Sequence, residues 1–288
     1  MTVTEKAYAK VNLFLDVTGC RDDGFHEISS VMHSVSLCDV LTVEAYHSDS
    51  TSISVLVNDS SLPTDEKNLV YMSAAKYLSY FNENARVLIR LEKHIPVGAG
   101  LGGGSADAAA TLRAMNKIFG FATETELYTI SSQIGSDVPF CLCGGLAHCR
   151  GRGERIEILD QSPKMIFVIS IGSERVSTPV AYERLDCMYN NFENYNSTLD
   201  ANILFGKNNS LDPNSLYNIF ESITDIDDIS KIKDIMRNNS AEAAMMSGSG
   251  PAVFGIFNNM DSAIMARNFL LEAGYTAYIA ESVYFNGE

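Results

Sequence analysis

The sequence contains no tryptophan, only seven prolines in 288 residues, and no apolar run of the roughly 18 residues that a transmembrane helix requires. Apolar residues nevertheless make up 46% of the chain, which excludes a disordered or collagen-like protein. The N-terminus also lacks the basic start and apolar core of a secretory signal. We therefore expect a globular cytoplasmic protein whose six cysteines are reduced thiols.

Basic side chains are scarce as well. Lys and Arg number 21 against 36 Asp and Glu, so the formal net charge is −15. Such a chain repels nucleic acid and anionic membrane surfaces, and we expect neither as a partner. An anionic ligand must be held by local positive charge, from backbone N–H groups, a few basic side chains or a bound cation.

The length suggests one large or two medium domains. Composition changes near residues 160–165, where a polar stretch precedes an apolar one. We place a boundary there, which gives an N-terminal domain over 1–160 and a C-terminal domain over 161–288.

Apolar patterning predicts a mixture of strands and helices. Predicted strands cover 7–17, 31–46, 51–57, 86–92, 165–171, 252–257 and 276–285. Predicted helices cover 69–81, 105–118, 123–134 and 261–273. Asn68 is the expected N-cap of the first of these helices.

The most informative segment is a glycine-rich stretch at residues 96–107, with the sequence PVGAGLGGGSAD. Glycine has no Cβ and tolerates positive φ, so consecutive N–H groups can converge on an anion. The helix that follows adds the positive end of its dipole. We predict a phosphate-binding loop; a flexible surface loop fits poorly between an apolar strand and an alanine-rich helix.

Two common phosphate-binding motifs fit this loop less well. A Walker P-loop needs a lysine before the serine, and none precedes Ser105. Gly98, Gly100 and Gly103 do match the dinucleotide spacing G-x-G-x-x-G. However, residues 93–96 separate them from the preceding strand, and no strand ending in an acidic residue follows about 20 residues later.

Five blocks of the sequence resemble the GHMP kinases, the family of galactokinase, homoserine kinase and mevalonate kinase. They follow the family order at 9–15, 23–27, 96–110, 134–140 and 246–251. The first, second and fourth are specific to the branch that acts on a cytidine diphosphate conjugate of methylerythritol. The resemblance implies a two-domain α+β fold. Its N-terminal, ATP-binding domain is of the ribosomal protein S5 domain 2-like type, its C-terminal domain is ferredoxin-like, and the site lies between them.

The resemblance implies ATP-dependent phosphorylation of the 2-hydroxyl of that cytidyl conjugate in non-mevalonate isoprenoid biosynthesis, with Mg²⁺ as cofactor. The resemblance also implies that Asn68 lies beside the adenine and that Ser105 is the candidate metal ligand. The implied ATP-binding loop consists of Pro96, Val97, Gly98, Ala99, Gly100, Leu101, Gly102, Gly103, Gly104, Ser105 and Ala106. The alternatives are a GHMP kinase of another small alcohol (homoserine, mevalonate or sugar type) and a catalytically silent nucleotide sensor. We expect a monomer or a homodimer.

Lys10 and Asp137 are the candidate catalytic residues. The resemblance implies that Asp137 takes the proton of the substrate hydroxyl. A weak base is sufficient for this when the proton is transferred late, in a loose transition state. Its alternative role is N-cap of the next helix, with Pro139 just inside. Lys10 lies in an apolar strand, where a lysine is costly unless paired, so we predict a pair with Asp137. A lysine pointing outward from an edge strand is the alternative.

Five residues are candidate substrate contacts. Asn12 shares a strand face with Lys10, and the resemblance implies that it touches the substrate. Phe25 and His26 suit stacking on, and hydrogen bonding to, a cytosine ring, and surface or core filling is the alternative for this pair. The remaining two candidates are Thr178 and Tyr182.

The segment from Thr178 to Tyr182 resembles one that supplies a hydroxyl and a second aromatic ring, so that Phe25 and Tyr182 would sandwich the base. The family commonly has Tyr at position 25 and Pro at position 22. The phenylalanine keeps the stacking and loses any hydroxyl contact.

Two further features carry less weight. Cys141, Cys143, His148 and Cys149 do not match the spacing of zinc ligands, and alternation along a strand accounts for them. Residues 248–251 predict a tight turn that closes the site near the methylerythritol end. An ordinary loop between a helix and a strand is the alternative there.

Overall fold

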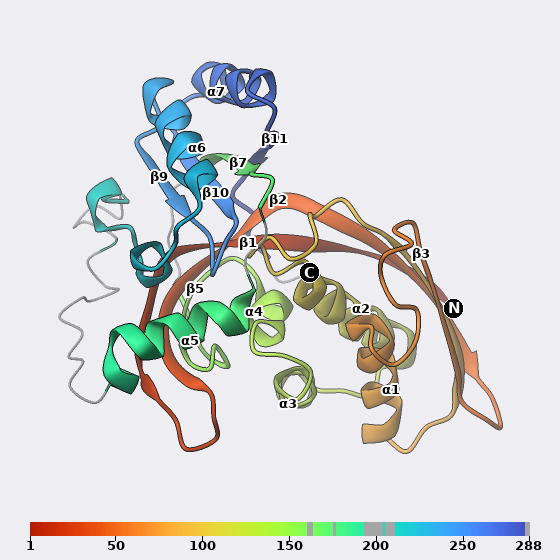
Figure 1. Cartoon of the computed structure of the whole chain (residues 1–288). Helices are drawn as coiled ribbons and strands as arrows, with labels where there is room; N and C mark the ends of the chain where they lie inside the picture. Colours follow the sequence, from red (N-terminus) through yellow and green to blue (C-terminus); the bar gives the residue numbers. More distant parts are fainter. Residues whose placement is uncertain (160–163, 175–176, 193–203, 205–210, 286–288) are drawn as a thin grey trace. The chain divides into compact units, whose positions relative to one another are not determined.

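A computed structural model describes residues 1–159, 164–174, 177–192, 204 and 211–285 (Figure 1). None of the helices in these ranges has both the length and the apolar character that a membrane-spanning helix needs. The chain divides into two compact units. Unit 1 comprises 1–9, 38–97 and 102–143, and unit 2 comprises 10–37, 98–101 and 144–288.

Two long strands, β1 (Thr2–Cys20) and β2 (His26–His47), contribute residues to both units. In unit 1 the second half of β2 pairs antiparallel with β4 (Ala85–Glu92), and β4 pairs in parallel with β3 (Ser52–Val57). Every second residue of β4 is buried, as expected for a strand with one face on a core.

Four helices complete unit 1. They are α1 (Leu69–Tyr80), α2 (Gly103–Phe119), α3 (Glu124–Ser132) and α4 (Val138–Cys143). Asn68 caps α1 through its side chain, as predicted, and Thr123 forms a capping box with Glu126 at the start of α3. Helix α2 packs against α1 and α4, so its first turn is held by neighbours.

In unit 2 the first half of β2 pairs antiparallel with β5 (Leu146–Gly151), which forms a hairpin with β6 (Arg155–Ile158). A short strand, β8 (Tyr217–Asn218), pairs in parallel with β1 at Phe14. No sequence pattern predicted this hairpin.

A four-stranded antiparallel sheet forms the rest of unit 2. Its order is β11-β7-β10-β9. The bounds are β7 (Ile166–Ile171), β9 (Ala243–Met246), β10 (Ala252–Phe257) and β11 (Thr276–Glu281). Helix α6 (Asp227–Asn238) follows β7 in the chain, and α7 (Met260–Glu272) follows β10; both pack on the sheet and on each other (Figure 1). This β-α-β-β-α-β order is the predicted ferredoxin-like arrangement.

The remaining elements of unit 2 are short, apart from one helix. They are α5 (Thr178–Met188), η1 (Asn190–Phe192), η3 (Pro213–Ser215) and η4 (Ile219–Ser222).

One prediction about local structure was wrong, and so was one of the alternatives. Cys141 and Cys143 lie in α4 and not on a strand, because Pro139 in its first turn presets a helical φ. The turn at 248–251 is tight, as predicted, but it joins the antiparallel strands β9 and β10 and so is not a loop between a helix and a strand. The boundary near residue 160 stays a prediction.

Candidate active site

The glycine-rich loop connects β4 to α2 and passes from unit 1 into unit 2 and back. Gly98, Gly100 and Gly102 have φ of +71°, +81° and +68°, the left-handed region that glycine enters without strain. At Gly100 a Cβ atom would also lie 2.3 Å from the Ser247 carbonyl oxygen. Only glycine fits this position, for steric as well as conformational reasons.

Within unit 2, residues 98–101 are held by two distant segments. The Ser247 hydroxyl donates to the Gly100 carbonyl (3.0 Å), and the Ala252 N–H donates to the Ala99 carbonyl (3.0 Å). The Lys10 N–H donates to the Leu101 carbonyl (2.9 Å). The middle of the loop is therefore tied to β1 and to the turn between β9 and β10.

Lys10 and Asn12 lie side by side, which confirms that they share a strand face. Lys10 Nζ donates to Asn12 Oδ1 (2.7 Å), Asn12 Nδ2 donates to Ser30 Oγ (2.8 Å), and Ser30 Oγ donates to the Phe14 carbonyl (2.8 Å). Lys10 is 4% exposed and Asn12 1%. A Cβ on Gly248 would lie 3.5 Å from Lys10 Nζ, so the ammonium group is also next to the β9–β10 turn.

Asp137 lies at the start of α4 in unit 1, where its carbonyl accepts a hydrogen bond from the Cys141 N–H (3.0 Å). The residue thus precedes the first turn of a helix, which agrees with its alternative role as the N-cap. The predicted pair of Lys10 and Asp137 would join residues of different units, and it stays a prediction.

The first turn of α2 forms the last part of the glycine-rich loop, in unit 1. Its N-cap is Gly102, which provides no side-chain hydrogen bond, and Ser105 is half-buried in the first turn. Asn68 uses its side-chain oxygen to cap Val70 N–H (2.9 Å) and donates through its amide to the Pro63 carbonyl (2.7 Å). Its predicted contact with adenine is untested.

A buried ion cluster beside the loop was missed by the sequence analysis. Lys93 Nζ donates to Asp39 Oδ2 and to Asp107 Oδ2 (2.6 Å from the latter). The other oxygen of Asp39 accepts from the backbone N–H groups of His94 and Ile95 (2.8 Å for Ile95). The cluster ties β2, the end of β4 and α2 together at both ends of the loop.

Burial dominates the electrostatics of this cluster. It raises the pKa of Asp107 well above the usual aspartate value, and the nearby Asp39 carboxylate acts in the same direction. Burial works to lower the pKa of Lys93, but the charges of Asp107 and Asp39 outweigh it and raise that pKa. No sequence motif marks these three residues, because their partners come from separate elements.

The structure brings His26 and Tyr182 together in unit 2. Their rings stack with centroids 4.5 Å apart, and His26 Nε2 lies 2.7 Å from Asp186 Oδ1. Phe25 is 48% exposed, and the guanidinium of Arg152 lies over its ring, 4.8 Å from the centroid. The predicted sandwich of a base between Phe25 and Tyr182 stays a prediction.

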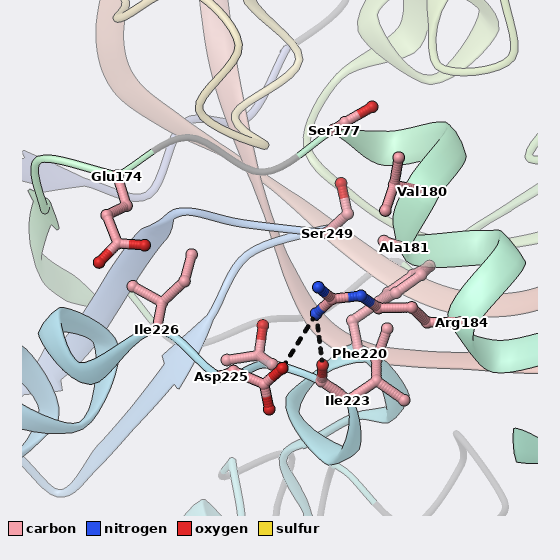
Figure 2. A pocket seen from close by; sticks show the side chains of 11 residues that line it. Glu174, Ser177, Val180, Ala181, Arg184, Phe220, Ile223, Asp225, Ile226 and Ser249 are labelled. Carbon is pink, nitrogen blue, oxygen red and sulfur yellow. Dashed lines mark hydrogen bonds and ion pairs between the residues drawn. The ribbon is translucent and has the colours of Figure 1, made fainter.

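Thr178, at the start of α5, contacts the β9–β10 turn, since its hydroxyl lies 2.8 Å from Ser249 Oγ. A cavity of about 300 Å³ borders the same place, with Ser177 and Ser249 in its wall (Figure 2). Arg184 also lines it; the dashed lines in Figure 2 mark its pair with Asp225 (3.2 Å) and its hydrogen bond to the Ile223 carbonyl (3.3 Å). The cavity gives this end of unit 2 a concave surface lined by both polar and apolar side chains.

Family comparisons match most of the elements described above. The family described as GHMP kinases N terminal domain matches residues 68–145, which include the glycine loop and α2. The family described as GHMP kinases C terminal matches residues 222–276, which include the β9–β10 turn.

Curated relatives align over nearly the whole chain. A protein of Caldicellulosiruptor saccharolyticus is 42% identical over 268 residues, covering 92% of this chain and 91% of the relative. A protein of Listeria innocua is 41% identical over 276 residues, covering 94% and 92%. Both relatives are named 4-diphosphocytidyl-2-C-methyl-D-erythritol kinase.

Solved structures agree with these relatives. A crystal structure of 4-(cytidine 5'-diphospho)-2C-methyl-D-erythritol kinase is similar with a TM-score of 0.79 and 31% identity, covering 97% of this chain and 99% of that one. The homoserine kinase of Cytophaga hutchinsonii has a TM-score of 0.73 at 20% identity, covering 98% and 95%, a likeness of fold alone.

Proposed function

Because the chain belongs to the GHMP kinases, and among them to the 4-diphosphocytidyl-2-C-methyl-D-erythritol kinases, we propose that it phosphorylates the 2-hydroxyl of 4-diphosphocytidyl-2-C-methyl-D-erythritol. ATP is the phosphoryl donor, and the products are the 2-phosphate and ADP. The reaction serves isoprenoid precursor biosynthesis. The predicted family and its α+β fold are confirmed, and the chain is an ATP-dependent small-molecule kinase.

The alternatives are less well supported. Likeness to homoserine and mevalonate kinases, at 20% and 12% identity, is one of fold. The relatives that are 42% and 41% identical carry the cytidyl name. A catalytically silent sensor would not need a buried lysine held beside a phosphate loop, and burying one is costly.

The glycine loop and α2 are proposed to bind the phosphates of ATP through residues 96–106. Positive φ at three glycines lets the backbone turn its N–H groups toward an anion, and the first turn of α2 adds uncapped N–H groups and the dipole. Backbone donors supply positive potential without basic side chains, which suits a chain of net charge −15. Asn68 is proposed to lie beside the adenine.

Ser105 is proposed as the protein ligand of Mg²⁺. It is half-buried in the first turn of α2 and offers a hydroxyl oxygen, the ligand type that Mg²⁺ prefers. Mg²⁺ keeps several waters and binds substrate phosphates, so one protein ligand fits its chemistry. When bound, it neutralises phosphate charge during transfer. Asp107 does not suit this role, because it is buried and bound to Lys93.

Lys10 and Asp137 are proposed to carry out the transfer. In a loose phosphoryl transfer the protein mainly positions groups and neutralises charge. Lys10 can stabilise the transferred group, since Asn12 and Ser30 fix its ammonium group before any substrate binds. Asp137 is proposed to accept the proton of the 2-hydroxyl.

His26, Tyr182, Phe25 and Thr178 are proposed to recognise the cytidyl part, and Asn12 the methylerythritol part. His26 is already oriented by Asp186 and by the stacked Tyr182 ring, so its hydrogen-bonding edge has a fixed direction. Phe25 remains exposed and offers a π-face for stacking.

The observation that carries the proposal is the buried chain of hydrogen bonds from Lys10 through Asn12 to Ser30, next to residues 98–101.

The test is coupled ADP release with the cytidyl substrate, homoserine, mevalonate and galactose. We expect turnover with the first alone, and strong loss in Lys10→Met. Lys6→Met is the matched control, because Lys6 lies exposed on the same strand. Turnover of another alcohol in preference to the cytidyl substrate would refute the assignment.

A further inference from the structure

Three side chains with metal-binding atoms meet at one end of the β1–β2 hairpin in unit 2. Cys20 is the last residue of β1, His26 is the first of β2, and Asp186 lies on α5. The sulfur, a ring nitrogen and a carboxylate oxygen all lie within 4.8 Å of one another. In the part of the chain that the structure describes, this is the one such group of three or more.

One separation already fits a tetrahedral ion, and a second is too short. Zinc bonds of about 2.3 Å to sulfur and about 2.0–2.2 Å to nitrogen and oxygen place neighbouring ligand atoms about 3.3–3.6 Å apart. Cys20 Sγ lies 3.6 Å from Asp186 Oδ1, within that range. His26 Nε2 lies 2.7 Å from the same oxygen and must move away by about 0.6 Å to share an ion with it.

The backbone fixes two of the three ligands. A tight turn joins β1 to β2, with the Arg21 N–H donating to the Phe25 carbonyl (2.8 Å). Tyr182, one helical turn before Asp186, stacks on the His26 ring and holds its plane. Cys20 is exposed and His26 and Asp186 are half-buried, so an ion can enter from solvent.

We propose that Cys20, His26 and Asp186 bind Zn²⁺ or an ion of the same class, with water as the fourth ligand. Thiolate and imidazole select zinc-type ions over Mg²⁺, which requires oxygen ligands. On binding, the Cys20 thiol releases its proton to solvent. His26 binds as the neutral ring with a bare Nε2 and its proton on Nδ1, the proton from Nε2 being exchanged through solvent.

The bound ion excludes the cytidyl substrate, a consequence that rests on the function proposed above. Zinc on Nε2 replaces the hydrogen bond to Asp186 that orients His26, and the ring must move by about 0.6 Å, so its other nitrogen no longer meets cytosine in the same position. Zinc therefore competes with the cytidyl substrate and leaves the affinity for ATP unchanged, which makes the site inhibitory.

The first test is a titration of the full, metal-free chain with Co²⁺, which takes zinc ligands and gives a near-ultraviolet charge-transfer band with thiolate. We expect the band in the unchanged protein, its loss in Cys20→Ser, and a Zn²⁺ affinity lowered by more than about tenfold in Cys20→Ser and Asp186→Asn. Cys187→Ser is the matched control, because Cys187 is also exposed and adjoins Asp186. It should keep the band. No band, or a band unchanged in Cys20→Ser, overturns the site.

The second test measures inhibition by buffered Zn²⁺ with excess Mg²⁺ and ATP. We expect the KM for the cytidyl substrate to rise and the KM for ATP to stay constant, with Cys20→Ser resistant and Cys187→Ser sensitive. Equal inhibition of Cys20→Ser overturns the exclusion. A protein that turns over no cytidyl substrate refutes the proposed function, while the Co²⁺ spectrum still decides the metal site.

Discussion

Replacing Lys93 with methionine keeps the length of the side chain but removes the ammonium group that Asp39 and Asp107 share. The side chains of Lys93, Asp39 and Asp107 are 6%, 0% and 4% exposed, so water cannot replace it. Asp39 keeps its backbone donors, His94 and Ile95. Among the described residues Asp107 Oδ1 has no hydrogen-bond partner, so most of the cost falls on Asp107. Removing one partner of a buried pair costs about 3–5 kcal/mol, and we expect Lys93→Met to lower the free energy of unfolding at pH 7 by this amount.

The loss should depend on pH. The pKa of Asp107 is raised in the folded state, so its contribution to stability is complete below the usual aspartate value and is lost as pH rises through the folded pKa. Lys93→Met removes a charge that lowers this pKa, so its loss of stability should extend to higher pH. The difference in the free energy of unfolding between the unchanged protein and Lys93→Met should therefore be small near about pH 4 and grow toward neutrality.

Urea unfolding followed by circular dichroism at several pH values measures these differences. The double variant Lys93→Met with Asp107→Asn should recover at least about 1 kcal/mol at pH 7, because the stranded carboxylate is gone. Arg150→Met is the control, since it breaks an ion pair with Glu157 in which both side chains are more than half exposed, and it should cost less than about 1 kcal/mol. A loss in Lys93→Met below about 1 kcal/mol, or one that is constant with pH, would refute the reasoning.

Three further predictions concern the loop and the site. Gly100→Ala should lower the free energy of unfolding by more than Gly98→Ala, because the two share a positive φ but only at position 100 would the new Cβ meet Ser247; equal losses in urea unfolding would count against it. Asp137→Asn should lower kcat by about 10²–10⁴ without changing the thermal midpoint, and a variant with full turnover would remove Asp137 from the mechanism. Tyr182→Ala should raise the KM for the cytidyl substrate by about tenfold, from the loss of about 1–3 kcal/mol of stacking, and leave the KM for ATP unchanged; a matching rise for ATP would indicate a structural effect.

Local signals predicted elements where the burial pattern follows one period. Strand β4 alternates between buried and exposed residues, and α1 has an asparagine cap, so both were predicted with nearly correct ends. Strand β5 buries five of its six residues and α4 buries five of its six, and neither pattern distinguishes a strand from a helix. Helix α5 buries only Ala181 and Leu185, which is too little to mark its apolar face.

In the candidate site, too, contacts between residues close in the sequence were predicted and contacts between distant residues were not. Lys10 and Asn12 lie two residues apart on one strand, so the period of a strand was enough to place them together. Asn12 and Ser30 are 18 residues apart, and Cys20 and Asp186 are 166 apart, so their contacts depend on register and on the docking of α5, which the sequence does not encode locally.

Gly100 depends both on a local sequence signal and on a contact with a distant segment. Its place in a glycine cluster predicted a positive φ, yet asparagine also tolerates that conformation. What excludes every other residue is the carbonyl oxygen of Ser247, 147 positions away, which lies only 2.3 Å from where a Cβ would stand. The turn between β9 and β10 therefore constrains the loop as strongly as the loop's own composition does. A substitution in that turn that moves Ser247 should change phosphate binding with every glycine of the loop intact.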